Sequence, residues 1–75
     1  MNLPLSKTQQ ALRGLRVEDM TDAQLRDWIN ACDRMERWPL IANKARRSWK
    51  AGRARAVSEL EKRQHLSQRR AGGAA

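Results

Sequence analysis

The sequence predicts an all-α protein built around an antiparallel helical hairpin, and two observations carry this prediction. Strong helix formers (Ala, Leu, Arg, Lys, Gln and Glu) dominate the composition, whereas β-branched residues are few and Tyr and Phe are absent. Apolar residues follow the helical period of about 3.6 along two stretches, which a short Trp-Pro connection separates.

The start of the first long helix has the clearest local signal. From Met20 the chain reads Met-Thr-Asp-Ala-Gln-Leu, in which Thr21 and Gln24 have the spacing of a capping box. Met20 and Leu25 have the spacing of a hydrophobic staple, a contact that sets the direction in which the chain enters the helix. We therefore expect a helix over residues 21–37.

Apolar residues of this helix recur at i, i+3, i+4 and i+7 and so occupy one face. They are Leu25, Trp28, Ile29, Cys32 and Met35. Trp38-Pro39 should end the helix, because the residue before a proline is pushed out of the α region and proline suits the first turn of a new helix. So short a connection favours antiparallel neighbours.

The second helix is expected over residues 39–66, and residues 21–68 then form the hairpin domain. The buried stripe of the second helix is predicted to contain Ile41, Ala45, Trp49, Gly52, Ala56 and Leu60. At the third position of this stripe, Ser48 is the alternative to Trp49. Small residues on this stripe would let a neighbouring helix approach closely. Gly52 has either such a packing role or a role in helix flexibility, and the sequence leaves both open.

The ends of the chain are less regular. Residues 1–20 form an N-terminal segment, in which Ser6 and Gln9 repeat the capping-box spacing and Gly14 could end a short helix. Apolar contacts of this segment would come from Leu12, Leu15 and Val17. Residues 69–75 have nothing to pack against and are expected to be disordered.

The chain is too short to bury a large core. With 75 residues it should bury about 60% of its unfolded surface, so that its stability is marginal without support. A single cysteine and a single histidine exclude an internal disulfide and the usual zinc-ligand spacing. The predicted helices differ in length, and one hairpin is too small to enclose three Trp. We therefore expect a homodimer in which two hairpins form a four-helix bundle.

Charge is divided unevenly along the chain. Residues 1–39 carry six basic and six acidic residues, whereas residues 40–75 carry ten basic and two acidic ones, so the net charge of +8 lies in the second part. This asymmetry indicates nucleic acid, a membrane surface or an acidic protein as partner. A membrane is disfavoured because the small residues of the second helix offer little apolar volume. No stretch has the length of a signal peptide or a membrane span, and we expect a cytoplasmic protein.

The basic residues of the second helix can be interpreted in three ways. They are Lys44, Arg46, Arg47, Lys50, Arg53, Arg55, Lys62 and Arg63. They could form a solvated surface, dock on an acidic protein, or bind the phosphates of a nucleic acid. In helical projection they surround nearly all of the arc outside the apolar stripe. This spread favours a protein over a nucleic acid, since a groove-reading helix more often gathers its charge on one face.

The residues that we expect to contact a partner lie at the hairpin tip and along the basic helix. They are Trp38, Arg46, Arg47, Trp49, Lys50 and Arg53. Trp38 is the first candidate for an exposed anchor, because Trp and Arg dominate the energetics of protein interfaces.

No catalytic, metal or cofactor site is predicted, and we expect a binding protein without enzymatic activity. Nucleophilic catalysis needs a nucleophile, a base and an orienting group, yet Cys32 projects from the predicted core face and His65 lies near the end of the second helix. The carboxylates of the first helix interleave with Arg and are expected to be solvated or paired within that helix. They are Asp22, Asp27, Asp33 and Glu36.

The layout of residues 15–64 resembles a known group of small proteins. The chain reads Arg-Val-Glu-Asp-Met-Thr from Arg16, before the amphipathic helix, and Lys-Ala-Arg-Arg-Ser-Trp from Lys44, at the start of the basic helix. It resembles small phage-encoded helical-hairpin proteins, and among them the phage quorum-sensing anti-activators. The resemblance implies a dimer in the host cytoplasm that inhibits a LuxR-type transcription regulator and also the pilus-assembly ATPase. The resemblance assigns only three residues as partner contacts, which are Arg46, Arg47 and Trp49.

Overall fold

The computed structural model describes the backbone of residues 3–74 and the side chains of residues 3–66. Its regular elements are α1 (Lys7–Ala11), the 3-10 helices η1 (Leu12–Gly14) and η2 (Val17–Asp19), α2 (Asp22–Arg37) and α3 (Asn43–Ala74). Strands are absent from residues 3–74, and the predicted all-α class is therefore confirmed. None of the helices in that range has both the length and the apolarity that crossing a membrane requires.

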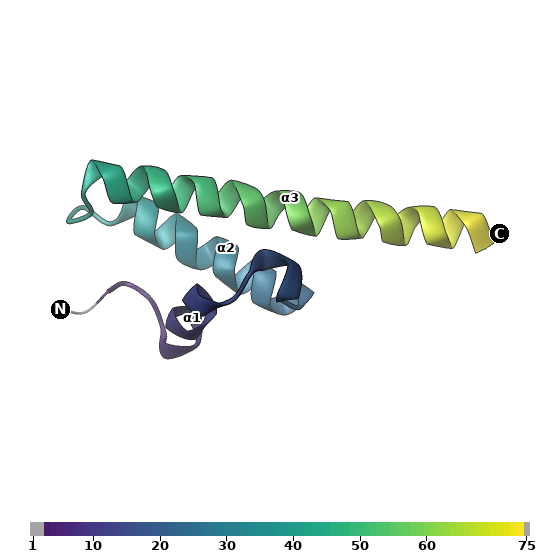
Figure 1. Ribbon diagram of the computed structural model, residues 1–75, viewed down its shortest axis with the longest axis horizontal. Coiled ribbons are helices and arrows are strands. Elements are labelled where there is room, and N and C mark those ends of the chain that lie inside the picture. Colours follow the sequence, from purple (N-terminus) through teal and green to yellow (C-terminus); the bar gives the residue numbers. More distant parts are fainter. Residues whose placement is uncertain (1–2, 75) are drawn as a thin grey trace.

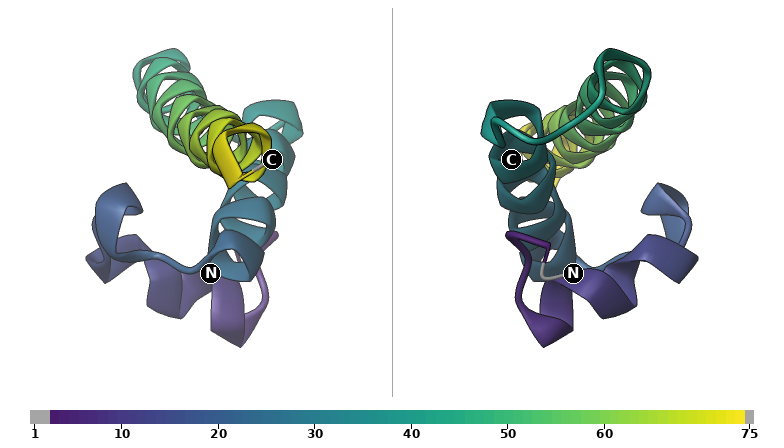
Figure 2. Two further views of the ribbon diagram at one scale, coloured as in Figure 1. Left: turned by 90° about the vertical axis from the view of Figure 1, so that its right-hand side faces the viewer. Right: turned by 90° about the vertical axis from the view of Figure 1, so that its left-hand side faces the viewer.

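The helices α2 and α3 lie side by side and run in opposite directions, with α1 on the side of α2 away from α3 (Figure 1). The rest of the N-terminal segment (residues 3–20) turns back toward α3, which η2 contacts. Seen along the long axis, α3, α2 and the η1–η2 stretch stand at three corners of a triangle (Figure 2). The molecule measures 52 × 22 × 16 Å. It is elongated because α3 has 32 residues and α2 only 16, so that α3 extends past the start of α2.

The capping box predicted at the start of α2 is confirmed. The Gln24 N–H donates to the Thr21 hydroxyl at 3.1 Å, and the Thr21 N–H donates to the Gln24 side-chain oxygen at 2.9 Å. Met20 and Leu25, the predicted staple, are buried in one apolar cluster. A second capping box, formed by Ser6 and Gln9, begins α1, so the short N-terminal helix is present as well.

The turn between α2 and α3 differs from the prediction. The Ile41 N–H donates to the Trp38 carbonyl oxygen at 3.2 Å, which closes a turn with Pro39 at its second position. Proline is favoured there because its fixed φ suits that corner of the turn. Pro39 therefore lies in the connection before α3 and not in the first turn of that helix. The helix α3 begins at Asn43, whereas the sequence predicted a start at residue 39.

The end of α3 also lies beyond the predicted boundary. The helix continues from residue 66 to Ala74 and so includes residues 69–74, for which the sequence predicts disorder. Arg69, Arg70 and Ala71 are strong helix formers and favour this continuation, against a cost of about 1 kcal/mol for each of Gly72 and Gly73. Residue 75, the last of the expected tail, lies outside the described part.

The apolar core consists of two clusters of buried residues. One contains Leu5, Ala31, Met35 and Ile41, and the other contains Leu12, Met20, Leu25 and Ala56. Trp28 packs against both and joins them. Of the other predicted core residues, Cys32 is fully buried, whereas Ile29, Ala45, Trp49, Gly52 and Leu60 are half-buried. Ser48 is exposed, so Trp49 and not Ser48 occupies the stripe.

The N-terminal segment contributes to the core through residues that lie before, within and directly after its short helix. Leu5 and Leu12 are buried, as is the polar Gln9. The Gln9 side-chain amide donates to the Asp27 carboxylate at 3.0 Å, which attaches α1 to α2. Leu15, expected to pack inward, is 44% exposed because the backbone becomes extended after η1 and carries it away from the core.

Candidate functional site

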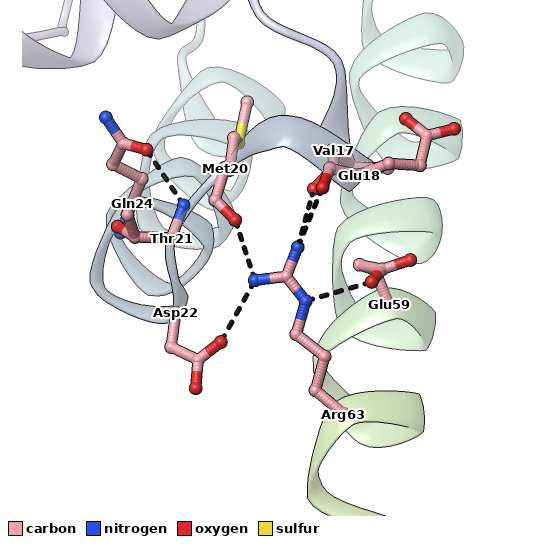
Figure 3. Close-up of polar contacts among 8 residues, drawn as sticks. All are labelled: Val17, Glu18, Met20, Thr21, Asp22, Gln24, Glu59 and Arg63. Atoms are coloured by element: carbon pink, nitrogen blue, oxygen red, sulfur yellow. Dashed lines mark hydrogen bonds and ion pairs between the residues drawn. The ribbon is translucent and has the colours of Figure 1, made fainter. Parts of the chain in front are cut away.

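Arg63 of α3 holds the N-terminal segment in place. Its guanidinium donates to three main-chain carbonyl oxygens and pairs with two carboxylates (Figure 3). The carbonyls belong to Met20, Glu18 and Val17, at 2.6, 3.2 and 3.3 Å. The carboxylates belong to Asp22 and Glu59, at 3.0 and 2.9 Å. These hydrogen bonds raise the pKa of the Arg63 guanidinium, with the bond to Asp22 the largest cause.

A second arginine of α3 joins that helix to the end of α2. Arg53 pairs with the Glu36 carboxylate, with Nε at 2.6 Å and Nη2 at 3.0 Å from its two oxygens. Arg46 donates to the Glu36 carbonyl oxygen at 3.1 Å. Arg46 and Arg53, which the sequence suggested as partner contacts, thus bond within the chain.

The carboxylates of α2 are mostly paired between elements, which corrects the expectation of solvation and pairing within the helix. Asp22 contacts Arg63, Glu36 contacts Arg53, and Asp27 accepts from Gln9. Only Asp33 pairs within α2, with Arg37 one turn later. These contacts were missed because spacing within one helix does not show which distant arginine will face it.

Up to residue 66, five basic side chains of α3 are exposed and form neither an ion pair nor a hydrogen bond with the described side chains and backbone. They are Lys44, Arg47, Lys50, Arg55 and Lys62. Because none of them pairs with a carboxylate in this part of the protein, most of their charge is directed at solvent or at a partner. We refer to them as the basic row.

A recess of about 370 Å³ lies between the η1–η2 stretch and the two long helices. Its walls come from the N-terminal segment, from Trp28 of α2 and from Gly52 and Arg55 of α3. The N-terminal segment contributes Arg13, Leu15, Arg16, Val17 and Glu18. A smaller hollow of about 220 Å³ shares Arg13, Trp28, Gly52 and Arg55 with it and reaches Trp49. We call the two together the basic recess.

Two indoles and an arginine form the inner wall of the basic recess. The rings of Trp28 and Trp49 have centroids 5.3 Å apart and are tilted by 48°. The Arg13 guanidinium lies 5.7 Å from the centroid of the Trp49 ring, within the range of a cation–π contact. Arg13 therefore attaches the end of η1 to α3 while it remains exposed to an incoming ligand.

Charge at the mouth of the basic recess is partly balanced. Glu18 lies 3.5 Å from Arg16, and both side chains are largely exposed. A hydrogen bond with its own backbone and, more weakly, the charge of Arg16 lower the pKa of the Glu18 carboxyl, which is therefore ionised at neutral pH. Arg13 and Arg55 have no carboxylate partner among the described side chains, so the lining of the recess carries more positive than negative charge.

Gly52 leaves the floor of the basic recess open. A Cβ at this position would meet only the Cys32 sulfur, at an ordinary contact distance of 4.0 Å. Close packing of helices therefore does not require glycine, which argues against the packing role considered from the sequence. Its effect in the structure is to leave free space beside Trp28 and Trp49.

The two residues considered from the sequence as possible catalytic groups are Cys32 and His65. Burial, and secondarily the nearby Glu36, raise the pKa of the Cys32 thiol to about 11, so the thiol is protonated at neutral pH. His65 is exposed on α3. Within the residues described, no three His, Cys, Asp or Glu side chains are grouped closely enough to hold a metal ion.

Comparisons of the chain with protein families, with curated proteins and with solved structures find no match. Functional assignment therefore rests on the geometry of this chain. In that geometry the basic recess is the candidate site, because it combines apolar and cationic side chains in one hollow.

The residues suggested from the sequence are dispersed over the molecule. Trp49 lies at the basic recess, and Arg47 belongs to the basic row. Lys50 also lines a shallow groove of about 360 Å³ on another part of α3. Trp38 is half-buried against the cluster of Leu5 and Met35, and the tip instead exposes Leu40, which is 75% accessible.

No local pattern groups Arg13, Arg16 and Arg55, because the N-terminal segment reaches α3 only through the tertiary fold. The one available signal was the apolar character of Leu15 and Val17 in an otherwise polar stretch.

Proposed function

We propose that this protein is a non-enzymatic binding module that docks on an acidic surface of a partner protein. The observation that carries the proposal is the division of the basic side chains of α3 into two sets. Arg46, Arg53 and Arg63 are used inside the molecule. The basic row remains exposed, and together with the basic recess it offers a cationic surface that an acidic partner would complement.

A protein fits this surface better than a nucleic acid for two reasons. The basic recess has apolar side chains, Leu15 and Val17, beside its arginines, and protein interfaces combine apolar and charged contacts in this way. Its indoles are tilted against each other, and Arg13 lies over Trp49, which leaves less open ring surface for stacking on bases. Nucleic-acid binding through the basic row alone is the alternative.

The resemblance to phage quorum-sensing anti-activators supplies the first named partners. On that resemblance we propose a LuxR-type transcription regulator of the host, and also the pilus-assembly ATPase, as proteins that this chain inhibits in the host cytoplasm. We also propose that two α2–α3 hairpins pair into a four-helix bundle. The length of α3 beyond α2 and the exposed Leu40 and Leu66 support pairing.

The partner class can be tested with two charge-reversal variants of equal net charge. Lys44→Glu/Arg47→Glu alters members of the basic row that do not line the basic recess, whereas Arg26→Glu/Arg34→Glu alters exposed arginines of α2. A host protein captured by the wild type from nuclease-treated lysate is purified and titrated with each variant. We expect the first variant to lose at least about tenfold in affinity, a change of about 1.4 kcal/mol, and the second to lose little. Equal losses would contradict docking through α3.

The nucleic-acid alternative is tested on labelled DNA and RNA over a range of salt concentrations. A binder that neutralises several phosphates loses affinity steeply as salt rises. Tight binding with such a slope, together with failure of the capture after nuclease treatment, would replace the proposed function. Light scattering at micromolar concentration tests the dimer, since a monomer there excludes the bundle.

A further inference from the structure

The basic recess has two chemically different sides. Leu15 is 44% exposed beside the half-buried Val17 and Trp28, and these form an apolar wall. The exposed Arg13 and Arg55 form a cationic rim with no carboxylate partner among the described side chains. An apolar wall next to cations gains most from a ligand that has an apolar group and a negative charge a short distance apart.

The dimensions of the basic recess suit side chains of a polypeptide. The larger hollow of the basic recess has a volume of about 370 Å³, at the lower end of the range for small-ligand pockets, which is about 300–1,000 Å³. A space of this size takes one large apolar side chain with neighbouring carboxylates at its rim. It is open on one side, so a segment of a larger molecule can reach it without threading.

We propose that the basic recess binds an acidic, apolar segment of a partner protein, with carboxylates of the segment against Arg13 and Arg55 and an apolar side chain against Leu15 and Trp28. This inference rests on the proposed function and deepens it, because it locates the specific contact in the recess instead of in the basic row. The other members of the basic row then contribute mainly long-range attraction, which accelerates encounter more than it prolongs the complex.

The site depends on the docked position of the N-terminal segment. Arg13 and Leu15 come from that segment, whereas Gly52 and Arg55 come from α3. The hydrogen bonds of Arg63 to the backbone of Val17, Glu18 and Met20 hold the two parts together. Arg63 is therefore a positioning residue for the basic recess and does not line it.

The protein carries its own reporter of binding. Trp28 and Trp49 line the basic recess, whereas Trp38, which packs against the same cluster of Leu5 and Met35, does not line it. In a Trp38→Phe background all indole fluorescence comes from the two recess residues. The probe is a short synthetic peptide in which Glu and Leu alternate around one Phe. The matched control peptide has Gln in place of every Glu. We expect a saturable change in emission with the acidic peptide and none with the Gln peptide.

Arginine variants then test the rim. In the same background, Arg13→Gln and Arg55→Gln should each weaken peptide binding by about threefold to fivefold, as expected for one exposed charge pair. Arg26→Gln, on the surface of α2, is the matched control and should leave the affinity unchanged. Equal affinity in all three variants would overturn the proposal.

Gly52 variants test the location without removing a charge. Gly52→Ala adds only a Cβ, which the site tolerates, and should bind the peptide as the parent does. Gly52→Leu fills the floor and should weaken binding by about tenfold or more while circular dichroism shows the same helix content. Unchanged affinity in a folded Gly52→Leu variant would place the peptide elsewhere and refute the recess.

The outcomes separate this proposal from the proposed function. If the captured host protein requires Arg47 but binds Gly52→Leu normally, docking on α3 stands and the recess proposal is wrong. If the peptide binds in the recess but no acidic protein partner is bound, the recess stands and the proposed function fails. A single-stranded oligonucleotide that changes recess fluorescence at lower concentration than the peptide would assign the recess to nucleic acid.

Discussion

Arg63 of α3 donates a hydrogen bond to the carbonyl oxygen of Met20 at 2.6 Å, across 43 positions of the chain. Met20 is the residue just before the cap of α2, so this bond fixes the entry into α2 against the middle of α3. The same guanidinium donates to the carbonyl oxygens of Val17 and Glu18. A lysine cannot make these bonds in the same geometry, because its ammonium group is compact and lacks the planar fork of donors.

Replacement of Arg63 should therefore lower the melting temperature more than replacement of any arginine that is only exposed. We expect Arg63→Lys to be destabilised as well, although it keeps the charge, because the carbonyls of Val17 and Glu18 lose their donors. Thermal unfolding followed by circular dichroism measures the effect, with Arg26→Lys as the control. Equal melting temperatures for Arg63→Lys and the wild type would contradict the role of the fork.

The pair of Glu36 and Arg53 should show measurable coupling. Its side chains are 15% and 37% exposed, so water screens it less than a fully exposed pair. A double-mutant cycle with Glu36→Gln and Arg53→Gln should give a coupling free energy of about 1 kcal/mol, near the upper end for pairs at a surface.

The control for that cycle is the pair of Asp33 and Arg37 within α2, whose side chains are 42% and 81% exposed. Its coupling should be about 0.3–0.5 kcal/mol or less. Urea unfolding of the variants gives both values. The interpretation of the Glu36–Arg53 contact fails if the two couplings are the same.

Gly52→Ala should raise the free energy of unfolding by about 1 kcal/mol, the difference in helix propensity between the two residues. The added Cβ meets only the Cys32 sulfur, at 4.0 Å. Ala51→Gly, at the exposed neighbouring position of the same helix, should lower it by a similar amount. A destabilised Gly52→Ala variant would mean that the helices pack more closely at this point than the contact indicates.

Alkaline pH should destabilise the protein through Cys32. The pKa of the buried thiol is raised from its ordinary value of 9.0 to about 11, because burial disfavours the thiolate. The folded state thus holds the proton more tightly than the unfolded chain. This contribution to stability is complete below pH 9.0 and is lost as the pH rises toward about 11.

Denaturant unfolding over this pH range measures the effect, and Cys32→Ala is the reference because it retains every lysine. The wild type should lose more stability with rising pH than the variant does. Parallel pH profiles would show that the thiol ionises equally well in the folded state. Alkylation of Cys32 at neutral pH should likewise be slow until the protein unfolds.

The features that could be predicted from the sequence are those fixed by neighbouring residues. The capping box of Thr21 and Gln24 and the apolar face that contains Leu25 and Met35 depend on spacings of three or four positions, and the structure contains both. The same reasoning placed the end of α2 at Trp38-Pro39. The predicted start of α3 was too early, because proline suits both the first turn of a helix and the second position of a turn. The hydrogen bond between the Ile41 N–H and the Trp38 carbonyl oxygen shows that Pro39 lies in a turn.

Features that depend on distant residues were not predictable. Arg63 was one member of a basic run, and nothing in its local sequence shows that three carbonyl oxygens of another segment face it. The basic recess was missed for the same reason, since its walls come from segments about forty positions apart. The periodicity of a single sequence indicates which residues share a face of one helix. It does not indicate which other segment that face will contact.

The order in which the chain leaves the ribosome gives the Arg63 contact a further consequence. The N-terminal segment is synthesised first, yet the donor that fastens its backbone comes 43 to 46 positions later. Contacts of such sequence separation form slowly, because a long loop must close before they add stability. A nascent chain can therefore form α2 early, but the walls of the basic recess come together only after α3 has emerged as far as Arg63.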